Sequence, residues 1–531
     1  MKLVTVAEML TIEKEADSQG LTYDLMMENA GRGLAEKIKN MFGDLKQTGI
    51  LALVGSGNNG GDALVALTYL AKQGWNTTAC IVRPRHPDDV LVNRLINAGG
   101  TIKIYDELED PENIFTLFKN HGVLLDGVLG TGIKLPLKDE VASVLQKVCQ
   151  CLKNDKNPPK VVAVDCPSGV DCETGQAAPE TIPADVTVTM AAVKIGLLQS
   201  PASQLVGDLQ VVGIGLDEGP YPPPTWQRVK RNVAEIAMIQ SWLPDRPFDA
   251  HKGTFGTALL VAGSLNYTGA ALLAGEAAFR VGAGLITLAI PEPLHPAIAG
   301  HFPESTWIIL PAESGVICEA AADLIFDNLE RATAMMLGPG FGIKEPTSKF
   351  IRQLFCTSQT GLTKLKPFPP LIIDADGLKL LARIKNWHQV LPTTSVLTPH
   401  PGEMSILTGL TTQEIQKKRL EIAESYSKIW GHVVVLKGAN TIVASPDGQT
   451  TVIPVATSAL ARAGTGDVLS GLIVGLLAQG VKPFAAAVTG CWIHGQAGLL
   501  AAENCGSTAT VLARDVLSAV IEVMKRLYST K

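Results

Sequence analysis

Short apolar runs rich in β-branched residues alternate along the chain with longer segments in which Ala and Leu recur at helical spacing. Runs such as ILALV, TTACIV and KVVAVD in the first part, and TALLVAG, LITLAI and HVVVLKG in the second, predict buried strands. Near-continuous apolar strands separated by helices are typical of parallel sheets that helices cover on both faces. The pattern therefore predicts an α/β fold built on doubly wound sheets.

The alternation lapses once, between Gly215 and Lys252, where proline and charged residues are concentrated. The stretch Tyr221–Pro224 cannot lie inside a sheet, because proline lacks the N–H group that a strand ladder needs. A chain of 531 residues also exceeds what one hydrophobic core normally serves. We therefore expect a boundary near residue 220, with one domain at residues 1–218 and a second at residues 225–531.

Composition and charge limit the classes of partner. A net charge of −6 offers no broad attraction to nucleic acid or to an anionic membrane surface. The apolar runs are broken well before the ~20 residues of a membrane span, and charges at Lys2, Glu8 and Glu13 interrupt the start of the chain. The nine cysteines lack metal or redox spacing. We expect a cytoplasmic protein with reduced thiols and with neither nucleic acid nor membrane as a partner.

The first strand leads into GSGNNGGD, where Gly55, Gly57 and Gly60 have the G-x-G-x-x-G spacing of a dinucleotide-binding loop. A conventional NAD site also needs an Asp or Glu roughly 20 residues further on, and the next apolar run ends in RPR instead. Asp62, at the start of the expected helix, would repel a nearby phosphate. By itself the loop fits a capped strand-to-helix turn as well as a cofactor site.

Two further apolar runs end in small and polar residues, at Asp126 with the glycines after it and at Asp165 with Ser168. Ligands bind beyond the carboxyl ends of the strands in a doubly wound sheet, so we expect these ends to form one pocket with the glycine loop. Asp165 is the candidate for proton transfer. Asn59, Asp126 and Ser168 offer oxygen ligands, which suit an alkali or alkaline-earth cation better than zinc. Taken singly, each acid is also compatible with a turn or helix cap.

Together these motifs resemble the NAD(P)H-hydrate epimerase domain, through MMENAG, GSGNNGGDALVA, LDGVLGTGIKLPL and VDCPSGVDCETG, over most of residues 1–216. The resemblance implies a Rossmann-like fold, hydrated nicotinamide nucleotide as substrate, and a potassium ion at Asn59, Asp126 and Ser168. It makes Asp165 the catalytic residue of this domain. The substrate contacts that it implies are Asn58, Asn59, Gly60, Gly61, Asp62, Gly130, Thr131, Gly132, Ile133, Lys134, Leu135, Pro136 and Asp165.

In the second half, ARAGTGDVLSG leads into an apolar helix. Gly464, Thr465 and Gly466 leave backbone N–H groups bare at its N-terminus, which favours a phosphate. Asp467 lies at the edge of this anion hole, where a carboxylate can act as a base toward an acceptor hydroxyl in phosphoryl transfer. The alternative for Asp467 alone is a helix-capping role.

Other expected strand ends also suit a nucleotide site. Lys437 ends an apolar run, and its ammonium can meet phosphate as a point charge. His400 stands between two prolines, which hold it rigidly on a strand-to-helix turn. GPGFG at Gly338–Gly342 is a second glycine loop, and Asp374 and Asp376 add carboxylates. We expect Mg²⁺ to accompany the nucleotide, held mainly by phosphates and water.

G-T-G-D resembles ribokinase-like folds in general. The ordered motifs HKGTFGTALLVAGS, TGAALLAGEAAFRVGAGLITLA, GPGFG, DADGLKLL, TPHPGEM, LKGANTIV and AGTGDVLSG resemble the ADP- or ATP-dependent NAD(P)H-hydrate dehydratase domain, over nearly all of residues 225–531. The resemblance implies that the hydrate contacts Ala270, Gly340, His400 and Asp467, with Asp467 as catalytic base. It implies that ADP or ATP contacts Lys437, Gly438, Ala439, Asn440, Thr441 and Gly466.

The two resemblances together imply a repair enzyme for hydrated NADH and NADPH (NADHX and NADPHX). The first domain would interconvert the R and S hydrates, and the second would phosphorylate the S form and eliminate phosphate, releasing AMP from ADP or ADP from ATP. We expect a homo-oligomer. Two alternatives stay open: a ribokinase-like vitamin or sugar kinase, and a first domain that binds a ligand without catalysing a reaction.

Overall fold

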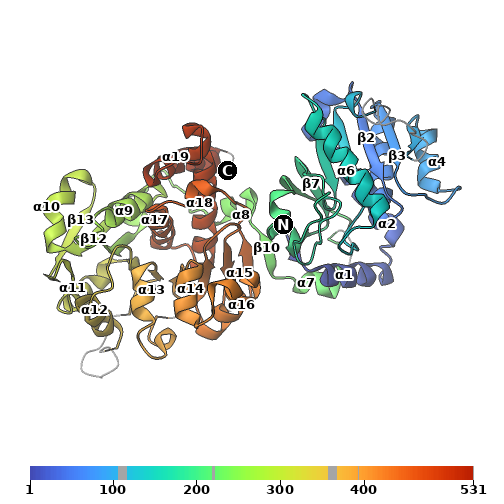
Figure 1. The fold of residues 1–531 in the computed structure, drawn as a ribbon. Helices are drawn as coiled ribbons and strands as arrows, with labels where there is room; N and C mark the ends of the chain where they lie inside the picture. The colour runs from blue at the N-terminus through green and yellow to red at the C-terminus, as the bar shows by residue number, and fades with distance from the viewer. Residues whose placement is uncertain (106–116, 218–221, 357–366, 393, 530–531) are drawn as a thin grey trace. The chain divides into compact units, whose positions relative to one another are not determined.

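A computed structural model describes residues 1–105, 117–217, 222–356, 367–392 and 394–529 (Figure 1). It divides into two compact units, Met1–Arg231 and Asn232–Lys531. The boundary that the sequence predicts near residue 220 falls on residues 218–221, outside the described residues. Helix α7 (Pro224–Arg228) packs on α1 (Val6–Ser18) and so belongs to the first unit. The start that we predicted for the second domain, residue 225, therefore differs slightly from the unit boundary.

The first unit is built on seven parallel strands in the order β4-β3-β2-β5-β6-β7-β9. These strands are β2 (Ile50–Val54), β3 (Thr77–Ile81), β4 (Thr101–Ile104), β5 (Val123–Gly127), β6 (Lys160–Val164), β7 (Val186–Met190) and β9 (Asp208–Val212). Strands β2 and β5 are neighbours although β3 and β4 lie between them in the chain. The direction of sheet growth reverses at this point, and ligands of doubly wound sheets bind beyond the carboxyl ends of the strands at such a reversal.

Helices cover both faces of this sheet because successive strand residues point to opposite faces. Ile50, Ala52 and Val54 belong to the core that contains the apolar residues of α1, α2 and α3, whereas Leu51 and Leu53 pack with α6. The helices after α1 are α2 (Tyr23–Phe42), α3 (Asn58–Lys72), α4 (Val90–Asn97) and α6 (Asp139–Asn154). A separate parallel pair, β1 (Leu3–Val4) with β8 (Val193–Lys194), brings the start of the chain beside Lys194.

The second unit contains a ten-stranded sheet in the order β10-β21-β20-β19-β18-β17-β16-β11-β12-β13. Its strands are β10 (Arg231–Val233), β11 (Thr257–Val261), β12 (Leu285–Pro291), β13 (Thr306–Leu310), β16 (Ala334–Leu337), β17 (Leu371–Ile373), β18 (Val396–Leu397), β19 (Val433–Leu436), β20 (Ile442–Ala444) and β21 (Thr450–Val452). The run from β19 to β13 is parallel, and β20 and β21 are antiparallel. The direction of growth reverses at β11, between β12 and β16. A short hairpin joins β14 (Ala312–Glu313) and β15 (Val316–Ile317).

Helices α9, α17, α18 and α19 share one apolar core on a face of this sheet (Figure 1). Helices α9 and α17 approach closely because α17 has glycines at the contact: a Cβ on Gly471 would lie 2.2 Å from the Ala274 carbonyl oxygen. The helices of this unit are α8 (Ile236–Trp242), α9 (Gly269–Arg280), α10 (His295–Ile298), α11 (Ala321–Asn328), α12 (Glu345–Cys356), α13 (Asp376–Leu381), α14 (Pro401–Thr408), α15 (Thr412–Lys417), α16 (Arg419–Trp430), α17 (Thr465–Ala478), α18 (Pro483–Cys505) and α19 (Ala513–Ser529).

Both units are thus α/β layers around parallel strands, which confirms the predicted fold class. Among the helices in the described ranges, none combines the length and the apolar character needed to cross a bilayer.

Candidate active sites

The first candidate site begins at the glycine loop between β2 and α3. Helix α3 starts at Asn58, and its N-cap residue Gly57 has no side chain to cap it. Arg85 supplies the missing support: its Nη1 donates to the carbonyl oxygens of Gly55 at 2.7 Å and Gly57 at 3.3 Å, and its Nε pairs with Asp89 at 2.7 Å. Arg85 follows β3, where an NAD site would have an acid. Its side chain therefore stabilises the glycine loop by binding two carbonyl groups of that loop.

Asn59, Asp126 and Ser168 lie together at the carboxyl ends of β2, β5 and β6. Asp126 is completely buried, and its carboxylate accepts hydrogen bonds from the Ser168 N–H at 2.7 Å and from Ser168 Oγ at 2.5 Å. Asn59 Nδ2 donates to the Leu129 carbonyl at 3.0 Å. Gly130 lies against the other side of this amide, since a Cβ there would be 2.5 Å from Asn59 Oδ1. Asn59 and Ser168 therefore both contact Leu129, whose N–H donates to Ser168 Oγ at 2.9 Å.

The charge of Asp126 has no cationic side chain within 4.0 Å among the described residues. Burial raises the pKa of this carboxyl, and the hydrogen bonds from Ser168 oppose that effect. An ionised carboxylate is costly in such a place unless a cation or several donors compensate it. At Asp126 the Ser168 N–H and hydroxyl provide such donors.

Asp165, at the end of β6, is held by a buried lysine. Its Oδ1 accepts hydrogen bonds from Thr189 Oγ1 at 2.8 Å, from the Met190 N–H at 3.0 Å and from Lys194 Nζ at 2.5 Å. Lys194 is 2% exposed; burial alone would lower its pKa, but Asp165 raises it overall. Within the part of the chain that the structure describes, no hydrogen bond ends on Asp165 Oδ2, so this oxygen is the one available to a substrate.

The backbone at Asp165 also has an unusual conformation. Its φ of 65° lies in the left-handed region, which an aspartate adopts at a cost that functional sites often carry. This conformation directs the carboxylate toward β7 and Lys194 rather than along the loop that follows. Tertiary contacts, not local preference, therefore set the position of the proposed base.

Two other carboxyl groups face the same ammonium. Asp62 on α3 is 7% exposed, and burial raises its pKa well above the usual range, an effect that the charge of Asp165 increases. Burial likewise raises the pKa of Glu13 on α1, with Lys194 opposing it. The site therefore combines an anchored carboxylate, Asp165, with a carboxyl group, Asp62, whose surroundings favour the neutral form. Such a difference between neighbouring carboxyls is typical of an acid–base pair.

Sequence reasoning missed Lys194 and Glu13. A lysine inside the apolar run AAVKIGLL is a signal that was present, because a charge in such a run is rarely buried without a partner. The other substrate-contact candidates are distributed around the strand ends: Gly60 and Gly61 are buried, Asn58 is exposed, and residues 131–136 form a largely exposed loop. The structure thus places Gly130 against Asn59, whereas residues 131–136 are largely exposed to solvent.

The second candidate site is organised around Lys437, at the end of β19. Its Nζ lies 2.7 Å from Asp374 Oδ1 and 3.7 Å from Glu403 Oε2. Asp374, which follows β17, also accepts a hydrogen bond from Ser470 Oγ at 2.6 Å. Burial alone would raise the pKa of Asp374, but Lys437 and Ser470 lower it overall. A Cβ on Gly466 would lie 3.9 Å from Lys437 Nζ, so the start of α17 also lies close to this ammonium group.

Asp467 lies in the first turn of α17, beyond Gly464, whose φ of 87° turns the chain into the helix. Burial raises the pKa of Asp467 to about 7; repulsion from Asp374 adds to this effect and Lys437 opposes it. A general base works best when its pKa is close to the working pH. The carboxyl beside the bare helix N-terminus is thus suited to take a proton near neutrality.

His400 and Glu403 form a capping box at the start of α14. The Gly402 N–H donates to His400 Nδ1 at 3.0 Å, and the His400 N–H donates to Glu403 Oε2 at 2.9 Å. Because Nδ1 accepts, Nε2 carries the proton, and it lies 3.3 Å from Glu403 Oε1. Burial lowers the pKa of His400, which favours this neutral ring. The histidine side chain is still 52% exposed, so it can also meet a ligand.

The remaining predicted contacts fall into two groups. Ala270 and Gly340 are neighbours, since a Cβ on Gly340 would lie 2.9 Å from the Cβ of Ala270. Residues 437–441 form the turn from β19 to β20, in which the Asn440 N–H donates to the Val455 carbonyl at 2.9 Å. Gly438 and Ala439 are exposed on this turn. Both groups lie beyond the carboxyl ends of strands in the same sheet as Lys437.

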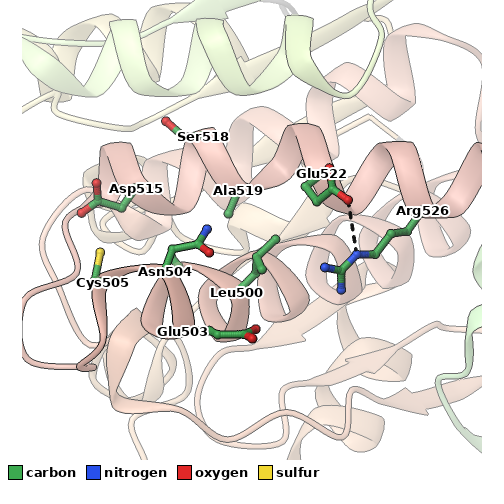
Figure 2. A pocket seen from close by; sticks show the side chains of 10 residues that line it. Leu500, Glu503, Asn504, Cys505, Asp515, Ser518, Ala519, Glu522 and Arg526 are labelled. Atoms are coloured by element: carbon green, nitrogen blue, oxygen red, sulfur yellow. Dashed lines mark ion pairs between the residues drawn. The ribbon is translucent and has the colours of Figure 1, made fainter.

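A groove of about 560 Å³ between α18 and α19 contains none of these residues. Figure 2 shows its acidic side chains and the ion pair between Glu522 and Arg526, whose Oε1 and Nε are 3.7 Å apart. The lining residues are Leu500, Ala501, Glu503, Asn504, Cys505, Asp515, Ser518, Ala519, Glu522 and Arg526. This groove is therefore separate from the predicted site residues.

Two protein-family models match the chain. One, described as NAD(P)H-hydrate dehydratase, matches residues 258–522, and the other, described as YjeF-related protein N-terminus, matches residues 24–196. A crystal structure of ADP/ATP-dependent NAD(P)H-hydrate dehydratase from Bacillus subtilis, co-crystallized with ATP/Mg²⁺, is 33% identical with a TM-score of 0.47, over 56% of this chain and 98% of that chain.

Two relatives match nearly the whole length of this chain. The bifunctional NAD(P)H-hydrate repair enzyme Nnr of Moorella thermoacetica is 34% identical over 99% of this chain and 97% of that protein. Its namesake in Escherichia coli is 32% identical over 96% of this chain and 92% of that protein. The chain therefore belongs to the family of bifunctional NAD(P)H-hydrate repair enzymes.

Proposed function

We propose that this chain repairs hydrated NADH and NADPH in two reactions. The first unit interconverts the R and S hydrates at C6, and the second dehydrates the S hydrate at the expense of ADP or ATP. The observation that carries the proposal is a carboxyl group with a pKa of about 7, Asp467, at the bare N-terminus of α17 and in the field of Lys437. Full-length similarity to repair enzymes supports the pairing of the two reactions on one chain.

In the second unit, Asp467 takes the proton of the 6-hydroxyl group. The oxygen of that hydroxyl group attacks the terminal phosphoryl group of ADP or ATP, and AMP or ADP leaves. The N1 lone pair then expels phosphate from C6, and loss of a proton from C5 restores the C5=C6 double bond. Phosphate leaves more readily than hydroxide. The N–H groups of Gly464–Gly466 receive the negative charge of the phosphoryl group. Mg²⁺, bound with the nucleotide, would neutralise further phosphate charge.

In the first unit, Asp62 in its neutral form donates a proton to the 6-hydroxyl group. This group leaves as water while the N1 lone pair forms a double bond to C6. Water then adds to the other face of C6, and Asp165 Oδ2 accepts the proton that this water loses. Lys194 holds the Asp165 carboxyl group in place by donating a hydrogen bond to Oδ1. The two carboxyls exchange roles in the reverse direction, as an epimerase requires.

A direct test supplies NADH hydrate with MgADP or MgATP and follows the absorbance of the restored dihydronicotinamide. We expect recovery with at least one donor, and complete recovery of a mixed R and S sample. A vitamin or sugar kinase would instead leave a stable phosphorylated product. The repair function is wrong if neither donor restores the absorbance.

We further propose that potassium binds Asn59, Asp126 and Ser168 and thereby braces the ends of β5 and β6. Potassium should raise the free energy of unfolding of the first unit by about 2.7 kcal/mol at 100 times its dissociation constant, because it binds only the folded state. Calorimetry in potassium chloride and in tetramethylammonium chloride at equal ionic strength measures this difference.

Asp126→Asn should remove the potassium effect because it removes the only charge in the donor set. Asp208→Asn, which changes an exposed carboxylate on β9, serves as the control and should keep it. An equal response of both variants to potassium would contradict the proposed site.

A further inference from the structure

Arg419, the first residue of α16, carries a charge that no acid balances. Its guanidinium has no carboxylate within 4.0 Å among the residues that the structure describes. Burial lowers the pKa of this side chain to about 10, with no opposing contribution from a negative group. Removing an arginine from solvent without an anion is unfavourable, so such a residue calls for a separate explanation.

The contacts of Arg419 lead to the turn at residues 437–441. Its Nη2 donates to the Leu436 carbonyl at 3.1 Å, and its Nη1 donates to the Lys437 carbonyl at 3.3 Å and to Gln416 Oε1 at 3.2 Å. Gly438 has a φ of 145°, and a Cβ there would lie 2.7 Å from Nη1. The guanidinium is therefore in direct contact with the backbone of the turn, and only glycine allows this approach.

We propose that Arg419 is a positioning residue of the nucleotide site: it fixes the turn at 437–441 through two carbonyl groups. The inference rests on the proposed function, because it takes residues 437–441 as the place where ADP or ATP binds.

The test measures the affinity of the full chain for MgADP and MgATP by titration calorimetry in Arg419→Gln and Arg419→Lys. We expect Arg419→Gln to weaken binding by at least about tenfold, as loss of hydrogen bonds from a charged group implies. Arg419→Lys should be intermediate, because it keeps the charge but loses the planar fork that reaches both carbonyls. The nucleotide KM should rise more than kcat falls.

Arg246 offers a matched control in the same unit. Its Nη2 donates to the Gly282 carbonyl at 2.9 Å, and a Cβ on Gly282, whose φ is 110°, would lie 1.5 Å from that nitrogen. It therefore supports a glycine turn in the way Arg419 does, but outside the residues assigned to the nucleotide. Arg246→Gln should lower thermal stability and leave the affinity for MgADP unchanged.

Wild-type affinity for both nucleotides in Arg419→Gln would overturn the inference, as would an equal loss in Arg246→Gln. If Arg419→Gln does not fold, Arg419→Lys decides: an intermediate affinity supports the inference and wild-type affinity overturns it. Failure of the wild-type chain to bind either nucleotide would instead overturn the proposed function, so the two failures are distinguishable.

Discussion

Asp467→Asn is expected to abolish dehydration of the S hydrate, lowering kcat by about 10²–10⁴, the usual contribution of a general base. The amide has nearly the shape of the carboxylate but cannot accept the proton of the 6-hydroxyl. The affinity for MgADP should change little, because the phosphate contacts come from the backbone of α17 and from Lys437. Recovery of dihydronicotinamide absorbance measures the first effect, and titration calorimetry measures the second.

The pH dependence follows from the same group. The wild-type rate should rise with pH through an apparent pKa of about 7, because only the ionised form of Asp467 accepts a proton. Its pKa in the folded state is raised, so the folded protein binds this proton more tightly than the unfolded chain does. Stability is therefore lost as pH rises from about 4 through about 7. At pH about 8, Asp467→Asn should raise the free energy of unfolding by at most about 4 kcal/mol, at 1.36 kcal/mol per pKa unit.

Asp323→Asn is a suitable control because Asp323 is an exposed carboxylate that also lies in the first turn of a helix, α11. This variant should keep the wild-type rate and pH profile. Retention of more than about a tenth of the rate by Asp467→Asn, or a flat wild-type profile around neutrality, would show that Asp467 is not the base.

Asp165→Asn is expected to abolish epimerisation while the same molecule still dehydrates the S hydrate. Loss of the base should again cost about 10²–10⁴ in rate, so the R hydrate should disappear only as fast as it epimerises spontaneously. Chromatographic separation of the two hydrates during turnover with MgADP measures this outcome. Dehydration of the S hydrate by the second unit is an internal standard for protein concentration and folding.

Asp165→Asn should also lower the free energy of unfolding by about 3–5 kcal/mol, because the amide leaves Lys194 buried without a counter-charge. The double variant Asp165→Asn with Lys194→Met removes both charges. It should recover stability without recovering epimerisation, which separates a chemical role of Asp165 from a structural one. Asp185→Asn, which breaks an exposed pair with Lys160, should leave both activities unchanged. Clearance of the R hydrate at the wild-type rate by the double variant would exclude Asp165 as the base.

Much of the fold follows from local pattern. The runs that predicted β2, β5, β6, β11, β16 and β19 are apolar because their strands are buried on both faces, and only parallel sheets covered by helices impose that composition. Several sheet strands were not anticipated. Three of them, β9, β10 and β13, carry partly exposed residues and lie at sheet edges. A strand with one exposed face alternates in polarity and gives a weaker signal than a buried one.

The two candidate sites likewise depend partly on local motifs and partly on contacts between distant residues. Motifs that combine glycine turns with polar residues are local in sequence, so Asn59, Asp165, Lys437 and Asp467 were predicted from their own neighbourhoods. What these side chains touch is not local. Lys194 meets Asp165 from 29 residues away, and Asp374 meets Lys437 from 63 residues away.

Two doubly wound α/β units, the strand ends that carry the predicted site residues and the resemblance to repair enzymes all follow from the sequence alone. The tertiary structure alone decided that a buried lysine orients Asp165, that two carboxylates offset Lys437, that burial brings Asp467 to a pKa of about 7, and that Arg419 supports the turn at 437–441. The physical reason is that charge balance and desolvation depend on which distant side chains share a volume. Strand pairing sets that volume, and it is not encoded in any short stretch of residues.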